Sequence, residues 1–293
     1  MKAVPVADSP APHYGVAMKS ATVALLGLLG ASMLATIPAS AAIGNWGHGQ
    51  RSEVRLLAAG VGKDGRLTAG IEIVLPRGWR TYWRTPGDAG VPPVIDFSAS
   101  KNLGPADVAF PLPTREDEGD DIVDNIYLDR VTLPVSATIA DPKKPVELSL
   151  RIHLGVCDKV CVPEDVTVAL TVPPNENDMA ATATIAAAVA LVPGPPEPGK
   201  FALDKVTRDG GTDGHPVFRF EGVVPDAANA HMFIEGPEDW FPYTPAFVHG
   251  GDGKAAYTVE FSRLGSPVPI AGARFRVTIA SGGRAIDQTL PLD

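Results

Sequence analysis

"VELSLRIHLGVCDKVCVPEDVTVALTV", residues 146–172, alternates aliphatic with polar or small side chains on either side of a short break. A period of two residues is typical of a β-strand with one face toward a core. The aliphatic residues take the even positions in 146–156 and again in 166–172. The three residues Asp158-Lys159-Val160 suit the turn of a hairpin that Cys157 and Cys161 would close. The stretch therefore predicts a β-hairpin at the centre of a β-fold.

The same period recurs along the chain, at residues 66–75, 131–139 and 274–279. Short strands separated by turns, with little helix, are typical of antiparallel sandwiches. One alanine-rich segment, 176–192, predicts a short helix, and PGPPEP at 193–198 predicts a stiff, extended connector. We therefore expect an all-β protein with two β-sandwich domains, joined by a short helix and a proline-rich linker.

The N-terminus has the pattern of a secretion signal. Lys19 precedes the apolar run ATVALLGLLGASMLA, and Ala39-Ser40-Ala41 has the small residues of a cleavage site. We expect a signal peptide over 1–41, with Met18 as an alternative start. An uncleaved anchor is the alternative, but the run is short for a membrane span. We expect a mature chain without a transmembrane span, exported to an oxidising compartment where disulfides form.

The net charge of the chain argues against one class of partner. The 293 residues carry a formal net charge of −9. Nucleic acids bind basic surfaces, so we expect no nucleic-acid partner.

The chain has only two cysteines, and the strand period places both on the polar face of the hairpin. Directly opposed residues in such a hairpin have Cα atoms about 4.5–5.5 Å apart, a separation that a disulfide accepts. We expect a disulfide between Cys157 and Cys161 to lie exposed at the end of the hairpin.

Three functions compete for this pair of cysteines. A structural staple across so short a loop would contribute about 2 kcal/mol. Two thiolates could instead hold Cu(I), with His153 close in sequence but about 13 Å away along a strand. Exposed disulfides tend to be the labile ones, which favours reversible thiol–disulfide exchange. The absence of a C-x-x-C motif excludes a thioredoxin active site.

Aromatic residues are the other candidates for the site. Trp79, Tyr82, Trp83 and Tyr127 could form a cap or platform beside the cysteines, or fill the core. Alternation places Trp79 and Trp83 on one face of a strand and Tyr82 on the other. The turn TPGDAG, 85–90, could overhang the disulfide. The acidic segment 115–129 lacks calcium-loop spacing, and we expect it to be a solvated loop.

Three motifs together resemble a known family. They are GWRTYWRTPGDAGVPPVIDF at 78–97, NIYLDRVTLPV at 125–135 and HLGVCDKVCVPED at 153–165. In this order they are similar to the N-terminal periplasmic domain of the DsbD family of disulfide reductases, closest to its suppressor-of-copper-sensitivity branch, ScsB. The resemblance implies a DsbD-like redox domain over 43–173, a linker over 174–199 and a second domain over 200–293. It also implies that both sandwiches are immunoglobulin-like.

The resemblance further implies a function in electron relay. Cys157 and Cys161 would be the catalytic pair of a protein-disulfide reductase type of oxidoreductase, with Cys161 as the attacking thiol and no organic cofactor. The family's membrane and thioredoxin domains have no counterpart in this sequence. We therefore expect a separate membrane electron-transfer protein, DsbD or CcdA-like, and periplasmic thioredoxin-like proteins as partners. The alternatives are a periplasmic Cu(I)-binding protein linked to copper tolerance, and a binding module with a structural disulfide.

Overall fold

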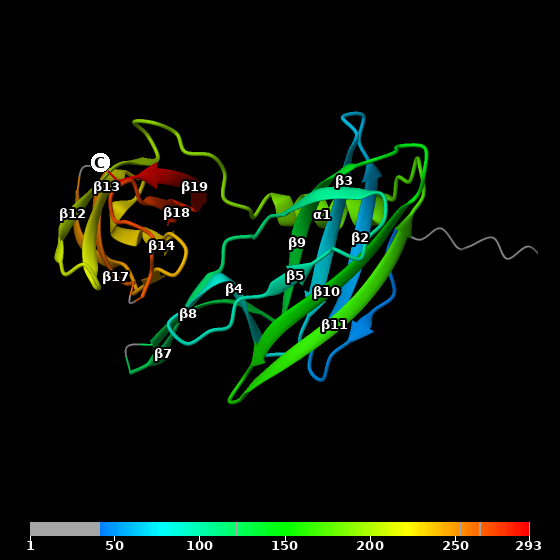
Figure 1. Cartoon of the computed structure of the whole chain (residues 1–293), viewed down its shortest axis with the longest axis horizontal. Helices are drawn as coiled ribbons and strands as arrows, with labels where there is room; N and C mark the ends of the chain where they lie inside the picture. The colour runs from blue at the N-terminus through cyan, green and yellow to red at the C-terminus, as the bar shows by residue number, and fades with distance from the viewer. Residues whose placement is uncertain (1–41, 121, 252, 264, 293) are drawn as a thin grey trace, which may run out of the picture. The chain divides into compact units, whose positions relative to one another are not determined.

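The computed structural model describes residues 42–120, 122–251, 253–263 and 265–292. The predicted signal peptide, 1–41, lies outside this part of the chain. The described residues form two β-sandwiches and one α-helix (Figure 1). This confirms the predicted all-β class.

The first sandwich packs two antiparallel sheets face to face. One sheet has the strand order β1 (Gly47–His48), β2 (Glu53–Val61), β3 (Arg66–Val74), β9 (Arg130–Ile139) and β6 (Leu103–Val108). The other has the order β11 (Cys161–Val172), β10 (Val146–Cys157), β4 (Arg80–Gly87), β8 (Ile122–Leu128) and β7 (Thr114–Gly119), with β5 (Val94–Asp96) paired to β10.

The core of this sandwich follows from the two-residue period. All even-numbered residues of β10, from Val146 to Val156, are buried and face the core. Alternate residues of β3, Leu67 to Ile73, pack against them from the opposite sheet. Burying an aliphatic side chain of this size contributes about 1.5–3 kcal/mol, so the alternation fixes the register of both sheets.

The second sandwich has its own core, which is rich in phenylalanine. One sheet has the order β12 (Ala202–Gly211), β13 (Pro216–Val223), β17 (Lys254–Ser262) and β15 (Phe241–Pro242), with β16 (Ala246–Gly251) also paired to β17. The other has the order β14 (His231–Glu235), β18 (Arg274–Ser281) and β19 (Arg284–Pro291). Phe218, Phe220, Phe261 and Phe275 are fully buried between the sheets and contact one another through their rings.

The segment between the sandwiches contacts both of them. Helix α1 (Met179–Val189) begins at Asp178, whose Oδ1 accepts from the amide of Ala181 at 2.7 Å. Ala181 and Ile185 are buried against Leu57 of β2, so the helix covers the outer face of the first sandwich (Figure 1). Gly194 then pairs with Ile286 of β19. The proline-rich segment is therefore joined to the second sandwich and is not a free spacer.

The expectation for the acidic segment was wrong in one respect. Most of residues 115–129 form the hairpin β7–β8, with Arg115 opposite Asn125 and Asp117 opposite Val123. The charges are tolerated because β7 is an edge strand, and because Arg80 of β4 pairs with Glu118 at 2.7 Å. Edge strands commonly carry charges, since one side of them meets water.

Candidate functional site

The two cysteines close the long hairpin β10–β11 as a disulfide. Cys157 lies opposite Cys161, with their Cα atoms 4.1 Å apart, and the turn is closed by the amide of Asp158 donating to the carbonyl of Val160. Cys161 is exposed, but Cys157 has no exposed surface. The expectation that both would be exposed was therefore wrong for Cys157. One sulfur faces solvent and the other faces protein.

Tyr82 is the residue that buries Cys157. It packs with Cys157 and Ile126 in a small apolar cluster on the face of the sheet opposite the main core. Its hydroxyl donates to Cys157 Sγ at 3.1 Å and lies 3.7 Å from Cys161 Sγ. A hydroxyl in this place can donate to a thiolate that forms on Cys157 when the disulfide opens.

A loop over residues 87–91 covers Tyr82 in turn. A Cβ on Gly90 would lie 2.3 Å from the Tyr82 ring, and a Cβ on Gly155 would lie 3.1 Å from Val91. Gly87 has φ of +101°, and a Cβ there would lie 2.3 Å from the carbonyl oxygen of Val123. Only glycine permits this close approach of loop and sheet. The turn noted in the sequence therefore does overhang the tyrosine beside the disulfide.

Charged groups surround the hydroxyl of Tyr82. Burial, reinforced by the charge of Asp124, raises the pKa of Tyr82 above its usual value, so the phenol stays a proton donor at neutral pH. Arg80 opposes this shift and is itself held between Glu118 and Glu116. Burial also raises the pKa of Asp124, although the amide of Ala89 donates to its Oδ1 at 3.1 Å.

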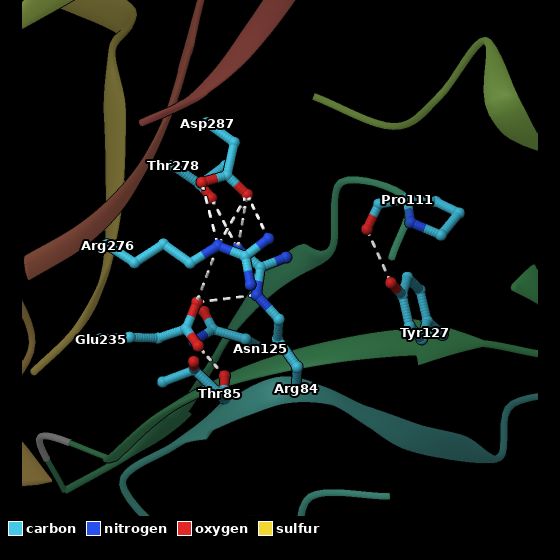
Figure 2. A network of polar contacts seen from close by, with 9 residues as sticks. All are labelled: Arg84, Thr85, Pro111, Asn125, Tyr127, Glu235, Arg276, Thr278 and Asp287. Carbon is cyan, nitrogen blue, oxygen red and sulfur yellow. Dashed lines mark hydrogen bonds and ion pairs between the residues drawn. The ribbon is translucent and has the colours of Figure 1, made fainter. Parts of the chain in front are cut away.

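The other aromatic candidates do not touch the sulfurs. Trp83 is fully buried in the first core, and Trp79 packs against the same core under the guanidinium of Arg51, 5.2 Å from its ring centroid. Tyr127 is buried, and its hydroxyl donates to the carbonyl of Pro111 at 2.6 Å (Figure 2). Of the four predicted aromatic candidates, the structure brings Tyr82 alone to the cysteines.

The strand that carries Tyr82 also contacts the second sandwich. Arg84 Nε donates to Glu235 at 2.7 Å, and its Nη2 donates to Thr278 at 2.9 Å and to Asp287 at 3.1 Å (Figure 2). The guanidinium lies 3.9 Å from the ring centroid of Trp83. Trp83 in turn meets Phe233 of β14 edge-to-face, with ring centroids 5.3 Å apart. The contacts to the second sandwich thus begin one residue beyond Tyr82.

Metal-ligating side chains are not gathered elsewhere in the described part of the chain. It contains no group of three or more His, Cys, Asp or Glu residues that could hold a metal ion. His153 faces Asp165, with its Nδ1 3.5 Å from the carboxylate. A copper site would rest on the two cysteine sulfurs, and copper binding stays an untested alternative.

Several residues of the site were missed by sequence reasoning. Arg80 and Asp124 flank Tyr82 but stand in segments that show no catalytic motif. The two-residue period offered one signal, because Arg80 and Tyr82 share a face of β4 and Arg80 lies opposite Cys157. The contacts of Arg84 with the second sandwich carried no signal in the sequence.

Together these features define a class of domain. A hairpin disulfide on an immunoglobulin-like sandwich, with one exposed sulfur and one under a tyrosine hydroxyl, is suited to thiol–disulfide interchange. Residues 53–173 match the family described as thiol:disulfide interchange protein DsbD, N-terminal. This segment of the chain is therefore a DsbD-type N-terminal domain, which confirms the resemblance seen in the sequence.

The fold of a larger part of the chain has a known counterpart. It is similar to the crystal structure of the N-terminal periplasmic domain of ScsB from Proteus mirabilis, with a TM-score of 0.68 and 21% identity over 86% of this chain and 99% of that chain. A comparison with proteins of curated function finds no match. No helix in the described ranges is long and apolar enough to cross a membrane.

Proposed function

We propose that this chain relays electrons between protein partners by thiol–disulfide exchange through Cys157 and Cys161. The observation that carries the proposal is the unequal placement of the two sulfurs, Cys161 exposed and Cys157 buried under Tyr82. Exchange requires one sulfur open to attack in line with the S–S bond, and a second sulfur that can leave as a thiolate. A structural staple requires neither feature.

In one direction, the exchange oxidises the partner and reduces this disulfide. A partner thiolate attacks Cys161 Sγ, the Cys157–Cys161 bond breaks, and its electron pair passes to Cys157 as a thiolate. The hydroxyl of Tyr82, 3.1 Å from Cys157 Sγ, donates to this thiolate as it forms. A second partner thiolate then attacks the partner sulfur of the mixed disulfide and releases Cys161. The partner loses two electrons and two protons, and this chain becomes the dithiol.

The reverse direction uses the same groups. The thiolate of Cys161 attacks a partner disulfide, and Cys157 resolves the mixed disulfide. A protein with these steps needs an electron donor and an electron acceptor. Family resemblance supports a separate membrane protein, DsbD or CcdA-like, on one side, and thioredoxin-like proteins on the other. It also supports a periplasmic location, reached through the signal peptide proposed at residues 1–41.

We further propose the domain limits that the sequence predicts. Residues 43–173 would be the redox domain, residues 174–199 the linker, and residues 200–293 the second domain. The separate apolar cores of the two sandwiches support this division. Because α1 packs on Leu57 of β2, the helix would be part of the folded redox domain.

A matched pair of variants tests the roles of the two sulfurs. In Cys157→Ala, the exposed Cys161 keeps its thiol but has no resolving partner, so mixed disulfides with partner proteins should accumulate. In Cys161→Ala, the remaining thiol of Cys157 is buried and should trap little or nothing. Non-reducing gels followed by mass spectrometry would read the trapped species. Equal trapping by both variants, or trapping by Cys157 alone, would contradict the proposal.

The reduction potential separates a relay from a staple. Alkylation and intact mass across a glutathione series should give a value between about −120 and −270 mV, the range of exchange proteins. A value below about −300 mV is typical of structural disulfides and would sink the relay function. Titration of the reduced protein with Cu(I) would test the metal alternative on the same sample.

A further inference from the structure

The second sandwich exposes a group of large apolar side chains. Phe241 is 68% exposed, and Tyr243 and Phe247 are each 48% exposed. We term these three residues the aromatic segment. Phe241 lies in β15, Phe247 lies in β16, and Tyr243 lies in the connection between the two strands. Clustered exposed aromatics commonly mark a surface for another protein.

The aromatic segment is held in place by its backbone. Phe241 pairs with Ser262 of β17, and the amide of Tyr243 donates to the carbonyl of Glu260 at 2.9 Å. Next to it, Thr244 Oγ1 donates to Asp88 Oδ2 at 3.2 Å, which joins the segment to the loop of the redox domain. A surface that is already ordered loses little conformational entropy on binding.

A groove of about 420 Å³ is lined by Phe241 and Tyr243 of the aromatic segment and by residues between 85 and 92 of the redox domain. Its apolar lining includes Pro86, Pro92, Phe233, Phe241, Tyr243 and Pro245. Arg115 and Asn125 add polar groups at its wall. Proline and aromatic side chains form stiff walls, which suit a groove that receives a folded or extended protein segment.

The groove reaches the loop that covers the tyrosine beside the disulfide. Gly90 lines it and packs on the ring of Tyr82, whose hydroxyl reaches Cys157. Val91, 45% exposed, follows Gly90 and lies beside Gly155 of β10. Val160, 65% exposed, stands in the turn between the two cysteines. Exposed apolar side chains are thus found in the cysteine turn, in the covering loop and in the aromatic segment.

We propose that this groove is the docking surface for a thioredoxin-fold redox partner, so that the second sandwich takes part in partner recognition. The proposal rests on the proposed function and deepens it. A partner thiol must reach the exposed Cys161, and the partner surface around that thiol must then cover the apolar groups near it. Thioredoxin-fold proteins present a low-pKa cysteine at a helix N-terminus, which delivers a thiolate from a flat protein surface. Free small thiols have no such surface and gain nothing from the groove.

The double variant Phe241→Ser/Tyr243→Ser in the full chain tests the proposal. Exchange of the oxidised protein with reduced thioredoxin should show a KM raised about tenfold or more, as expected for the loss of central apolar anchors. Exchange with glutathione should change by less than about twofold. Alkylation with intact mass would follow both reactions. The thermal midpoint should stay near that of the wild type, because both side chains are largely exposed.

A matched control removes apolar side chains from a different surface. Met179 and Leu191, 84% and 64% exposed, lie at the ends of the helical segment, and Met179→Ser/Leu191→Ser should leave both reactions unchanged. An equal KM for thioredoxin in the wild type and in the aromatic-segment variant would overturn the proposal. So would a wild-type chain that reacts with glutathione but not with thioredoxin.

Two further results would separate a failure of the proposed function from a wrong choice of partner. A disulfide that neither glutathione nor thioredoxin reduces would contradict the proposed function itself. Sedimentation could show that the wild type is a dimer and the aromatic-segment variant a monomer. A second copy of this chain would then fill the groove, which would overturn the choice of partner.

Discussion

Tyr82 is the residue that distinguishes the two sulfurs of the disulfide. Its ring covers Cys157, and its hydroxyl is placed to donate to that sulfur when it leaves as a thiolate. Hydrogen bonds to charged groups contribute about 1.5–3 kcal/mol. The tyrosine therefore bears on the rate at which the disulfide opens.

Replacement of Tyr82 by Phe should slow reduction of the disulfide by glutathione about tenfold, because the leaving thiolate loses its donor. Stopped-flow alkylation of the released thiols would measure this rate. Tyr127→Phe is the control, since its hydroxyl bonds Pro111 and not a sulfur. That variant should lose about 1 kcal/mol of stability and keep the wild-type rate. Equal rates in wild type and Tyr82→Phe would remove Tyr82 from the mechanism.

Asp124 predicts a pH dependence of stability. Its pKa is raised in the folded protein, mainly by burial, so the folded state binds this proton more tightly than the unfolded chain does. Folding is therefore favoured below the unfolded pKa of about 3.9, and this contribution is lost as pH rises through the higher folded pKa. Asp124→Asn keeps an acceptor for the amide of Ala89 but cannot ionise.

The Asp124→Asn variant should therefore unfold at higher urea concentration than the wild type at pH 7, and the difference should shrink as pH falls below about 4. Urea titrations at a series of pH values would measure this. A difference that grows toward low pH would show that the sign is wrong. Asp117→Asn is the control, because Asp117 is exposed on β7.

For single residues, the sequence predicted which face of a strand a side chain occupies better than whether that side chain is buried. The two-residue period correctly separated Tyr82 from Trp79 and Trp83, and it placed Cys157 opposite the main core. It could not reveal that Cys157 is covered, because the cover comes from a residue 75 positions away in the sequence. Burial of a polar-face residue depends on which loop folds over it, and local periodicity carries no information about that.

The loop over residues 87–91 and the hairpin β7–β8 form the element that covers the site. Asp88 accepts from the amide of Val123 at 2.9 Å and donates its own amide to the carbonyl of Val123 at 3.1 Å. The loop is thus fastened to the backbone of β8 through the amide and the side-chain carboxylate of Asp88, and Gly87 makes the close approach possible.

Gly87→Ala should destabilise the protein by about 2 kcal/mol or more, since the new Cβ meets the carbonyl oxygen of Val123 at a positive φ. The displaced loop should also uncover Tyr82 and speed reduction by glutathione. Gly119→Ala is the control, with φ of +83° but no atom within 4 Å of the new Cβ. It should lose about 1 kcal/mol and leave the rate unchanged. Denaturant titration and alkylation kinetics would compare the two, and equal losses would contradict the proposed close contact.

Elements were predicted well where a core imposed a pattern. β3, β9, β10 and β18 lie where alternating residues placed them. The acidic residues of β7 and β8 show no apolar alternation, so their sequence predicts a loop where the structure has a hairpin. Their pairing is stabilised by Arg80 from another strand and by the edge position of β7, and neither can be read from the segment itself.

The contacts between the two sandwiches belong to the whole molecule. Arg84 is 10% exposed and bonds two carboxylates and a hydroxyl of the second sandwich. Arg276 also pairs with Glu235 and Asp287, so the acidic groups keep a partner when Arg84 is removed.

Arg84→Ala should lower the free energy of unfolding by about 2 kcal/mol. This is below the usual loss for a broken buried pair, since Arg276 still compensates the two carboxylates. Unfolding followed by urea should also become less cooperative as the two sandwiches lose their coupling. Arg208→Ala is the control, because it breaks an exposed pair with Asp213 and should change stability by less than about 0.5 kcal/mol. A loss as small as that of the control would show that the Arg84 network does not couple the sandwiches.

The presence of two sandwiches was predictable, and their contact was not. Alternating strands on both sides of a proline-rich segment indicated two cores. Arg84 and Asp287, however, are 203 residues apart, and a single arginine in a strand gives no sign of its distant partners. Periodic patterns in the sequence reflect which residues are buried in each core. A contact between domains depends on which side chains meet at the surfaces of the two folded sandwiches.

The burial of Trp83 against Phe233 limits how this molecule can be dissected. The indole is fully buried, and Phe233 of β14 contributes to the core of the first sandwich. A fragment cut at residue 173, where the family match ends, would leave that tryptophan partly exposed to solvent. It would also remove Glu235 and Asp287, the carboxylates that pair with Arg84. Such a fragment would bring solvent to the strand that carries Tyr82. A potential or rate measured on it would describe an altered site, and the physiological chemistry has to be measured on both sandwiches together.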